Sequence, residues 1–483
     1  MRIDNADLQG SVNLHKTITD IKSNPSNGAV VIADGVPYII RGGNNVAYMS
    51  ATGLSYSGGF GALNMYEIPL PESGSVQDIG PYGTSAFVLF TNGNLYTVGI
   101  NAVGQLGLGD TTDRTVFTLS NTGVTRVFTS PSNGDRNTGG ESRLIIQKTD
   151  NKVYGCGFNL YGNLGLGNTT QVISSWTELT WCGTSPLSVW NMGNTIGGTY
   201  CQKSDGTVFA TGWNNEGQLG NGSTAVTVST PVNVTNNWLG GTFAATGMVI
   251  QQVVASYGYF DGNTNNESSI TMFMDNGTTS RIASAGANSQ GALGDGTTIN
   301  RSTPVVPTGF SGRVRQIGRV GGGALSSVHV VKTDNTYWNW GYNANGQLGR
   351  GNNTNQPTPS QVRTDVLQMF DAVYATSTTA YQCCSPILET AIAYFITGFN
   401  GNGGLGVGDA TARNTFTQMR FPAGIRLSKA GSMTTVNELT SRYAVDTNNN
   451  FYAWGENAFN GVNDSNTVDV TVPIRVAPPA LVR

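Results

Sequence analysis

One sequence pattern recurs along this 483-residue chain and constrains its fold more than any other feature. The pattern is Gly-x-Asn-x-x-Gly-x-Leu-Gly-x-Gly, and it has six intact copies, a worn copy that begins at Gly455 and a fainter one that begins at Gly42. Successive copies begin 57, 58, 55, 74, 55, 57 and 57 residues apart. Self-similarity at such a period is typical of repeat proteins, so the chain is interpreted as one.

The glycine, asparagine and leucine of each copy are predicted to form a corner of the scaffold. Glycine permits positive φ and close backbone approach where a strand leaves one sheet for the next. Asparagine bonds nearby backbone groups and holds the turn closed, and leucine is expected to pack between neighbouring units. No Lys-Ser/Thr pair follows the glycines, which argues against a phosphate-binding loop. The corner residues are Gly99, Asn101, Leu106, Gly157, Asn159, Leu164, Gly212, Asn214, Leu219, Gly286, Asn288, Leu293, Gly341, Asn343, Leu348, Gly398, Asn400 and Leu405.

A hairpin signal precedes most corners. Asx-Gly or Asx-Asn pairs between alternating apolar runs predict a β-hairpin, and the unit that ends at Gly398 lacks such a pair. Two further β-type runs precede each hairpin, so each unit is expected to hold four strands and no helix. The turn pairs are Asn92 and Gly93, Asp150 and Asn151, Asp205 and Gly206, Asp334 and Asn335, Asn448 and Asn449, Asp34 and Gly35, and Asn276 and Gly277.

Four-stranded units at this period predict an all-β propeller, because no unit can bury both of its faces alone. Three strand-like runs precede Gly42 and one, VPIRV, follows Gly455. Together they are expected to form one sheet that closes the ring between the N- and C-terminal strands. Seven or eight blades result, and the repeat count favours eight. Residues 1–20 are expected to be an arm or first strand, and 21–483 the propeller, with an enlarged loop in 236–270.

The corner motif, its following strand and its hairpin closely resemble the regulator-of-chromosome-condensation repeat, over roughly residues 25–480. The resemblance implies a propeller, for which seven blades are the family norm. It also implies several alternative roles, namely nucleotide exchange on a small GTPase, chromatin docking, β-lactamase inhibition and protein interaction. No exchange position matches residue by residue, and the nearly neutral N-terminal region disfavours chromatin docking.

The composition argues against several classes of function. Charged residues make up only 11% of the chain and the net charge is −3, which argues against electrostatic nucleic-acid binding. The two histidines, His15 and His329, are too few for a histidine zinc site, and no cofactor is expected. Neither a signal peptide nor a membrane span is predicted. Five cysteines without a CxxC pair are interpreted as small apolar side chains in a reduced compartment.

Two groups of aromatic residues are candidates for binding a protein or a surface glycan. Rings flanked by amides and hydroxyls can stack and hydrogen-bond with such ligands. The alternative is that the rings fill gaps between blades. The first group is Trp238, Phe243, Tyr257, Tyr259 and Phe260, and the second is Trp176, Trp181 and Trp190.

A non-enzymatic binding or structural role is the preferred functional hypothesis. The low charge, the Asn-, Gly-, Ser- and Thr-rich composition and the opening residues 1–14 resemble phage fibre subunits, so a virion-associated role in host attachment or particle structure is predicted. The alternative is a cytoplasmic adaptor, such as an exchange factor or inhibitor. A third hypothesis is a glycan hydrolase with paired carboxylates. Its candidate acids are Glu141, Asp261, Glu267 and Glu389.

Overall fold

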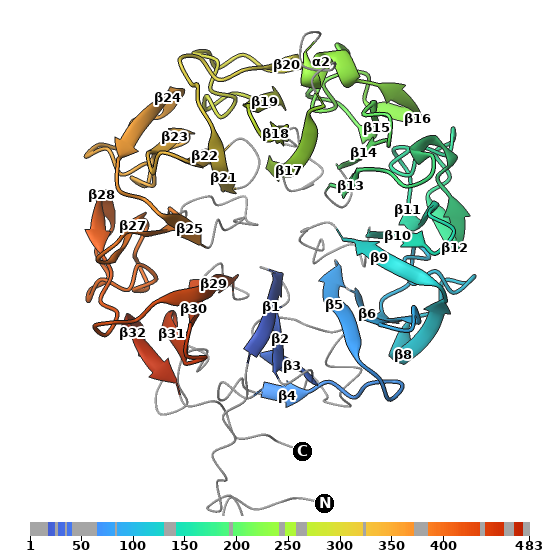
Figure 1. Ribbon diagram of the computed structural model, residues 1–483, viewed down its shortest axis with the longest axis horizontal. Coiled ribbons are helices and arrows are strands. Elements are labelled where there is room, and N and C mark those ends of the chain that lie inside the picture. The colour runs from blue at the N-terminus through green and yellow to red at the C-terminus, as the bar shows by residue number, and fades with distance from the viewer. Residues whose placement is uncertain are drawn as a thin grey trace, which may run out of the picture.

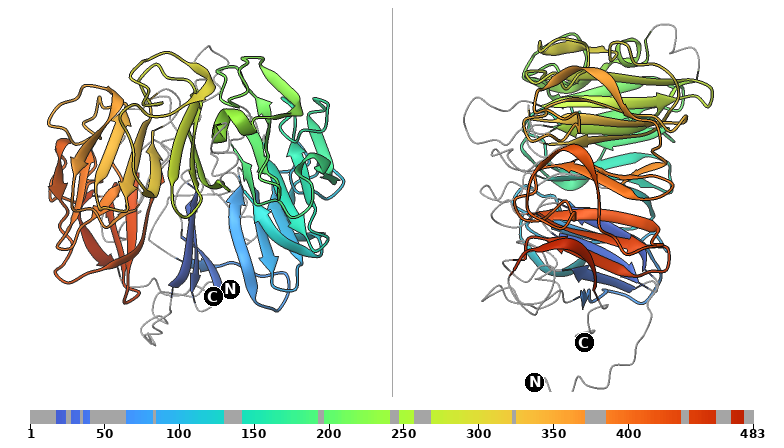
Figure 2. Two further views of the ribbon diagram at one scale, coloured as in Figure 1. Left: turned by 45° about the horizontal axis from the view of Figure 1, so that its top comes forward. Right: turned by 90° about the vertical axis from the view of Figure 1, so that its left-hand side faces the viewer.

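The computed structural model contains eight sheets of four antiparallel strands, arranged side by side around a central axis (Figure 1). We number them 1 to 8 in chain order; for sheet 1, only the backbone is described. The model describes residues 18–24, 28–33, 36–40, 65–82, 85–129, 142–192, 197–240, 247–256, 268–321, 325–370, 385–434, 440–457 and 468–476. Within each sheet the first strand lies nearest the axis and the fourth lies at the rim (Figure 1). Neighbouring sheets pack face to face (Figure 2).

The first four sheets cover residues 18–233 in order along the chain. Sheet 1 has β1 (Ile18–Asn24), β2 (Gly28–Ala33), β3 (Val36–Ile40) and β4 (Met65–Glu67). Sheet 2 has β5 (Val76–Tyr82), β6 (Ser85–Phe90), β7 (Leu95–Gly99) and β8 (Arg114–Asn121). Sheet 3 has β9 (Val124–Phe128), β10 (Arg143–Lys148), β11 (Val153–Phe158) and β12 (Val172–Glu178). Sheet 4 has β13 (Ser188–Asn191), β14 (Gly198–Gln202), β15 (Val208–Trp213) and β16 (Thr227–Asn233).

The other four sheets follow in the same order. Sheet 5 has β17 (Val249–Ser256), β18 (Ser269–Asp275), β19 (Ser280–Gly286) and β20 (Arg301–Val305). Sheet 6 has β21 (Val314–Val320), β22 (Ser327–Lys332), β23 (Tyr337–Gly341) and β24 (Gln356–Arg363). Sheet 7 has β25 (Gln368–Phe370), β26 (Ile387–Glu389), β27 (Tyr394–Gly398) and β28 (Arg413–Gln418). Sheet 8 has β29 (Leu427–Thr434), β30 (Thr440–Asp446), β31 (Phe451–Gly455) and β32 (Val470–Val476).

The predicted all-β propeller of seven or eight four-stranded blades is confirmed, with sheet 1 described by its backbone alone. The expectation of no helix was wrong at two short elements. A 3-10 helix η2 (Thr180–Cys182) follows β12, and an α-helix α2 (Thr235–Leu239) follows β16. Part of the predicted enlarged loop, 236–270, is therefore regular structure, because α2 and β17 both fall within it.

The predicted closing sheet was wrong, since no sheet in the described ranges combines strands from both ends of the chain. The VPIRV run lies in β32 and pairs with β31 of sheet 8, while β4 completes sheet 1 by pairing with β3. The physical reason is the position of the corner. It joins the third and fourth strands of one sheet, rather than leading from one sheet to the next. Sheet 1 instead stands between sheets 2 and 8, and its strand β1 lies beside β5 of sheet 2 and β29 of sheet 8 (Figure 1).

The predicted hairpins join the second and third strands of their sheets. The second residue of each described turn has positive φ, at 87° for Gly93, 86° for Gly206 and 90° for Gly277. Three asparagines take the same conformation, with φ of 63° at Asn151, 65° at Asn335 and 62° at Asn449. Glycine and asparagine are the residues that adopt this conformation at least cost, which explains the dipeptide pattern. The pair Asp34 and Gly35 lies outside the described residues.

Candidate functional site

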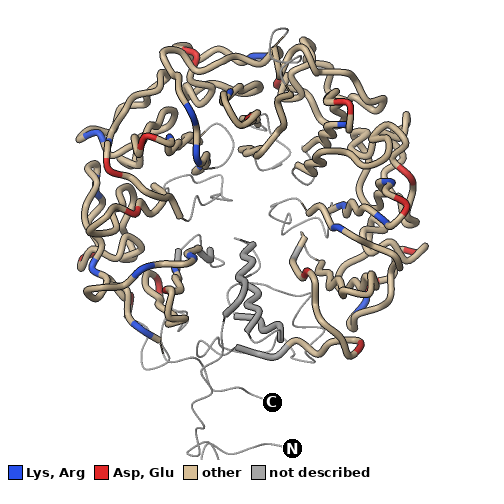
Figure 3. The backbone as a smooth tube through the Cα atoms, in the orientation of Figure 1, with Lys and Arg blue, Asp and Glu red and all other residues tan. Residues whose placement is uncertain are grey.

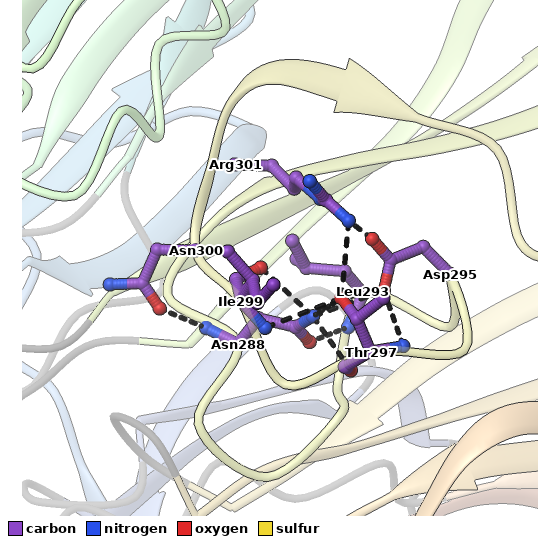
Figure 4. Close-up of polar contacts among 7 residues, drawn as sticks. All are labelled: Asn288, Leu293, Asp295, Thr297, Ile299, Asn300 and Arg301. Atoms are coloured by element: carbon purple, nitrogen blue, oxygen red, sulfur yellow. Dashed lines mark hydrogen bonds and ion pairs between the residues drawn. The ribbon is translucent and has the colours of Figure 1, made fainter.

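Each corner is closed by its asparagine, as Figure 4 shows for the corner between β19 and β20. The Oδ1 of Asn288 accepts a hydrogen bond from the Leu293 backbone N–H at 2.9 Å. Its Nδ2 donates to the carbonyls of Thr297 at 3.0 Å and Ile299 at 3.2 Å, while its backbone N–H donates to Asn300 at 2.9 Å. The same 2.9 Å bond to the leucine N–H is made by Asn101, Asn159, Asn214, Asn343 and Asn400.

The six corner leucines are fully buried between neighbouring sheets. Leu106, for example, packs with Leu95 of its own sheet and with Leu144 and Ile146 of sheet 3. The last glycine of each corner also donates a hydrogen bond to the outer strand of the next sheet, at 2.6–3.0 Å. The corners are therefore parts of the scaffold that join each sheet to the next. These bonds run from Gly109 to Ser174, Gly167 to Ser229, Gly222 to Ser302, Gly296 to Pro357, Gly351 to Asn414 and Gly408 to Thr471.

Three corners carry an ion pair that sequence reasoning missed. The pairs are Asp110 with Arg114 at 2.6 Å, Asp295 with Arg301 at 2.7 Å and Asp409 with Arg413 at 2.6 Å. Each arginine pairs across the sheet with the corner glycine, and the corners that have asparagine in place of the aspartate carry Ile173, Val228 or Gln356 there. The aspartate lies eleven residues after the corner glycine at Asp110 and Asp409 but nine residues after it at Asp295, so alignment of the repeats places only two of the three pairs in register.

Burial opposes the ionised form of Asp295, but hydrogen bonds from Thr297 and Arg301 outweigh it and hold the pKa of this carboxyl below its usual value. In Figure 4 the Asp295 carboxylate points toward the Arg301 guanidinium at the outer side of the corner. The pair is satisfied within the corner, so it stabilises the loop rather than presenting a free charge.

The tryptophans predicted to bind a ligand are part of the scaffold. Trp238 in α2 is 0% exposed and its Nε1 donates to the Leu219 carbonyl at 2.9 Å, so the prediction of an exposed binding ring there was wrong. The indole packs in the core around sheets 4 and 5 and donates a hydrogen bond to a buried carbonyl, which a smaller apolar side chain could not do. Trp181 is half-buried and makes the equivalent bond to Leu164 at 3.0 Å.

The remaining aromatic candidates do not come together in the described structure. Trp176 is half-buried on β12 and donates to the Ser120 hydroxyl at 3.0 Å. Trp190 is half-buried on β13 and packs on the core between sheets 4 and 5. The other four lie outside the described residues, and they are Phe243, Tyr257, Tyr259 and Phe260.

The predicted carboxylate pair is not assembled in the described ranges. Glu389 on β26 is nearly buried, accepts a hydrogen bond from the Tyr394 hydroxyl at 3.3 Å and lies 3.8 Å from the Arg426 guanidinium. The other three acids, Glu141, Asp261 and Glu267, lie outside the described residues. In the described part of the chain no group of three or more His, Cys, Asp or Glu could hold a metal ion. Three cysteines, Cys156, Cys182 and Cys201, are buried free thiols.

A fully buried polar group surrounds His329 on β22. Its Nε2 lies 2.8 Å from the Ser327 hydroxyl and its Nδ1 lies 2.5 Å from the Tyr337 hydroxyl. A serine beside a histidine is the arrangement of many nucleophilic sites, but all three side chains are 0% exposed, so no substrate reaches them. Desolvation, assisted by the nearby Arg350, lowers the pKa of His329 to about 3. The imidazole is therefore a neutral part of the core.

This burial predicts a pH-dependent stability. Below the usual histidine pKa of 6.5 the unfolded chain binds a proton that the folded chain does not, so stability falls as the pH falls toward 3. We expect the free energy of unfolding to decrease by about 2 kcal/mol between pH 7.5 and pH 5.0 through this group alone. Urea unfolding at the two pH values should show a smaller decrease for His329→Gln than for the parent. His15→Gln is the control, and an unchanged pH effect in His329→Gln would contradict the prediction.

Five exposed large apolar side chains lie in the corners or outer strands of sheets 2 to 5. Large apolar side chains exposed in succession along one rim are unusual for a protein without a partner. We call this set the apolar rim. It consists of Val116 in β8, Leu160 and Val172 in sheet 3, Val226 beside β16 and Ile299 beside β20.

Two of the rim residues, Val226 and Ile299, occupy equivalent positions of the repeat. Two residues before the strand residue that pairs with the corner glycine, sheets 4 and 5 have Val226 and Ile299. The same position holds threonine in three other sheets, at Thr112, Thr354 and Thr411, and the exposed Val468 in sheet 8. Ile299 is 62% exposed, so burial does not explain the apolar choice.

Few charged residues are present around the ring (Figure 3). At the rim the described charges are largely paired, as in the Asp110 and Arg114 pair. Glu216 of sheet 4 accepts a hydrogen bond at 2.5 Å from Asn300 of sheet 5 and so connects two neighbouring corners. No helix in the described ranges is long and apolar enough to cross a membrane. The apolar rim is therefore the candidate functional surface.

Comparison with known proteins finds one repeat family and several similar solved structures. Residues 205–256 and 334–376 match the model of the regulator of chromosome condensation (RCC1) repeat. The chain is similar to the solved structure of human WBSCR16, with 17% identity, a TM-score of 0.48 and coverage of 77% of this chain and 87% of that one. It is also similar to Prp20p from Saccharomyces cerevisiae, reported with its binding properties to Gsp1p and histones, at 16% identity, a TM-score of 0.48 and coverage of 80% and 87%. The described chain is thus a β-propeller, and its segments 205–256 and 334–376 are similar to the RCC1 repeat.

Proposed function

We propose that this chain is a non-enzymatic scaffold that binds another protein through the apolar rim. The observation that supports the proposal is the presence of exposed apolar side chains in the corners or outer strands of four successive sheets, 2 to 5. Such a patch, surrounded by satisfied polar groups, has the composition of a protein interface. A folded partner is favoured over a small ligand, because the rim spans several sheets.

The corners make the rim a pre-ordered surface. Each corner asparagine fixes its loop, and each corner hydrogen-bonds to the next sheet, so the rim residues are held before a partner arrives. Ordering a flexible loop on binding would reduce the affinity, and a rigid loop avoids that cost. The scaffold therefore supports binding without contributing a reactive group of its own.

A cellular adaptor is the form of this function that we favour, with a cytoplasmic location. Prp20p was reported with binding to Gsp1p and histones, and a partner of the small-GTPase kind is one candidate for this chain. The virion hypothesis rests on the low charge, on the Asn-, Gly-, Ser- and Thr-rich composition and on residues 1–14, and these residues lie outside the described structure. The glycan hypothesis rests on aromatic rings that are buried or half-buried within the scaffold, or that lie outside the described residues. We therefore propose neither a virion role nor glycan binding.

Replacing Val116, Val226 and Ile299 together by threonine should abolish partner binding without unfolding the protein. Threonine is the residue that other repeats of this chain carry at the position of Val226 and Ile299, and all three side chains are exposed. Affinity purification from cells that express the protein, with quantitative mass spectrometry, should recover a partner at least tenfold less with the triple variant.

The control is Thr411→Val in sheet 7, which makes the reverse change away from the rim and should leave partner recovery unchanged. The thermal melting temperature of each variant establishes that the fold is retained. Equal recovery of the same partners by the parent and the triple variant would contradict the proposal. So would a parent protein that captures no protein but binds a glycan array.

A further inference from the structure

The hairpin between β26 and β27 departs from all the other described hairpins. Its tip has Ala391 and Ile392 where the others carry an Asx-containing turn. The Thr390 backbone N–H donates to the Ala393 carbonyl at 2.9 Å, and the Thr390 hydroxyl lies 3.1 Å from the Ala393 N–H. The threonine thus replaces the missing Asx side chain in holding the turn. At the tip, Ile392 is 89% exposed, the highest value among the large apolar side chains of the described chain.

The linker between β28 and β29 lies beside this hairpin. The Met419 backbone N–H donates to the Tyr394 carbonyl at 2.9 Å, and the Leu427 N–H donates to the Tyr394 hydroxyl at 2.7 Å. Phe421 packs on the Tyr394 ring with a centroid distance of 5.4 Å. The linker is thereby fixed along the start of β27, next to the hairpin tip.

The exposed part of this linker adds apolar surface and one cation. Pro422 and Ala423 are exposed, and so is Arg426. We name these residues, together with Ala391 and Ile392, the sheet 7 patch. Beneath it lie the buried Tyr394 and the half-buried Phe421. The patch combines apolar side chains on a fixed backbone with a guanidinium at its edge.

The charge of the patch indicates what it would bind. The Arg426 side chain is 67% exposed and lies 3.8 Å from the Glu389 carboxylate, beyond hydrogen-bond distance. Glu389 itself is nearly buried. At the adjoining β24–β25 connection, Arg363 and Asp365 neutralise each other at 2.7 Å. Glu389 thus partly balances the charge of Arg426, but the guanidinium is the exposed member of this ion pair and is the group that a carboxylate of a partner can contact.

We propose that the sheet 7 patch docks an acidic peptide segment that carries a large apolar side chain beside its carboxylates. The large apolar side chain of the peptide is buried against Ile392, Pro422 and Ala423, and a carboxylate of the peptide pairs with Arg426. Such exposed apolar side chains are otherwise unfavourable at the tip of a hairpin, where the other sheets carry polar residues.

This site is separate from the apolar rim. The hairpins join second to third strands and the corners join third to fourth, so the two lie at opposite ends of antiparallel strands. The proposal therefore goes beyond the function proposed above, and either can fail without the other. A protein with both surfaces would connect two partners.

A random library of displayed twelve-residue peptides, selected on the immobilised rim triple variant, tests the proposal. We expect enriched peptides to contain at least two Asp or Glu next to a large apolar residue. Synthetic copies of these peptides should bind at least tenfold more weakly to Ile392→Asn and to Arg426→Gln. Binding should also weaken as salt rises from 50 to 300 mM, because the ion pair is screened.

The matched control is Thr278→Asn, which alters the exposed tip of the β18–β19 hairpin and should leave peptide affinity unchanged. Ile392 and Arg426 are both exposed, so their substitution should leave the melting temperature unchanged. Three outcomes would overturn the proposal: no enriched peptide, enriched peptides without acidic residues, or affinities that Ile392→Asn leaves unaltered.

Discussion

Leu219→Asp is expected to destabilise the propeller by about 4 kcal/mol or more. Leu219 is fully buried and packs with Tyr200, Val228 and Trp238 in the core around sheets 4 and 5. Truncating a buried leucine alone costs about 2–5 kcal/mol. The new carboxylate would in addition be removed from water without a partner, which costs several kcal/mol more or forces its protonation. Thermal unfolding followed by circular dichroism should show a large decrease in melting temperature.

Leu160→Asp is the matched control, since Leu160 lies in the neighbouring corner but is partly exposed. Its substitution should change stability by less than about 1 kcal/mol. If Leu219→Asp and Leu160→Asp melted at the same temperature, the role assigned to the corner leucines would be wrong.

Gly162→Ala is expected to cost about 3–5 kcal/mol, although it adds a single methyl group. Gly162 has φ of 71°, a left-handed conformation that costs a residue with a Cβ about 1–2 kcal/mol. The added Cβ would also lie 2.2 Å from the Cα of Ser229, on the outer strand of the next sheet. Because that neighbour is backbone, relief requires sheets 3 and 4 to move apart, with a packing cost of a few kcal/mol.

Gly167→Ala separates the two effects. Gly167 has nearly the same φ, 74°, but no atom lies within 4 Å of the position of its Cβ. We therefore expect only the conformational cost of about 1–2 kcal/mol. Urea unfolding of the two variants measures the difference, which reports how closely the corner approaches the next sheet. Equal losses of stability would show that this approach does not matter.

The sequence predicted the elements that repeat. Asn288 and Leu293 recur at fixed spacing, and in every described copy the asparagine bonds the leucine N–H. The turn residues Gly93 and Asn151 could be predicted for the same reason, because only a few residue types adopt positive φ at little cost. Periodic local signals of this kind depend on neighbouring residues alone.

Other features depend on contacts that the sequence does not reveal. The assignment of β32 to sheet 8 follows from the pairing of the corner glycine Gly455 with Val470, and the repeat pattern alone does not say whether the strand after a corner stays in the same sheet or enters the next one. The burial of Trp238 depends on α2 packing over Leu219, and a tryptophan in a polar segment has the same local sequence whether it is exposed or buried. The exposure of Ile392 likewise became apparent only in the structure, although its departure from the turn pattern was visible in the sequence.

The grouping of four consecutive strands into each sheet has an evolutionary consequence. Apart from the 74-residue interval, the repeats are 55–58 residues long. Duplication or loss of one such stretch would add or remove a complete sheet together with its corner, and every strand pairing would survive. In a propeller whose last sheet combines strands from both chain ends, the strand pairings would also survive such a change. The N- and C-terminal strands would then have to pair with each other again in the correct register. In this chain only the angle between neighbouring sheets must adjust. A single recombination event can therefore change the number of sheets in the ring by a whole unit.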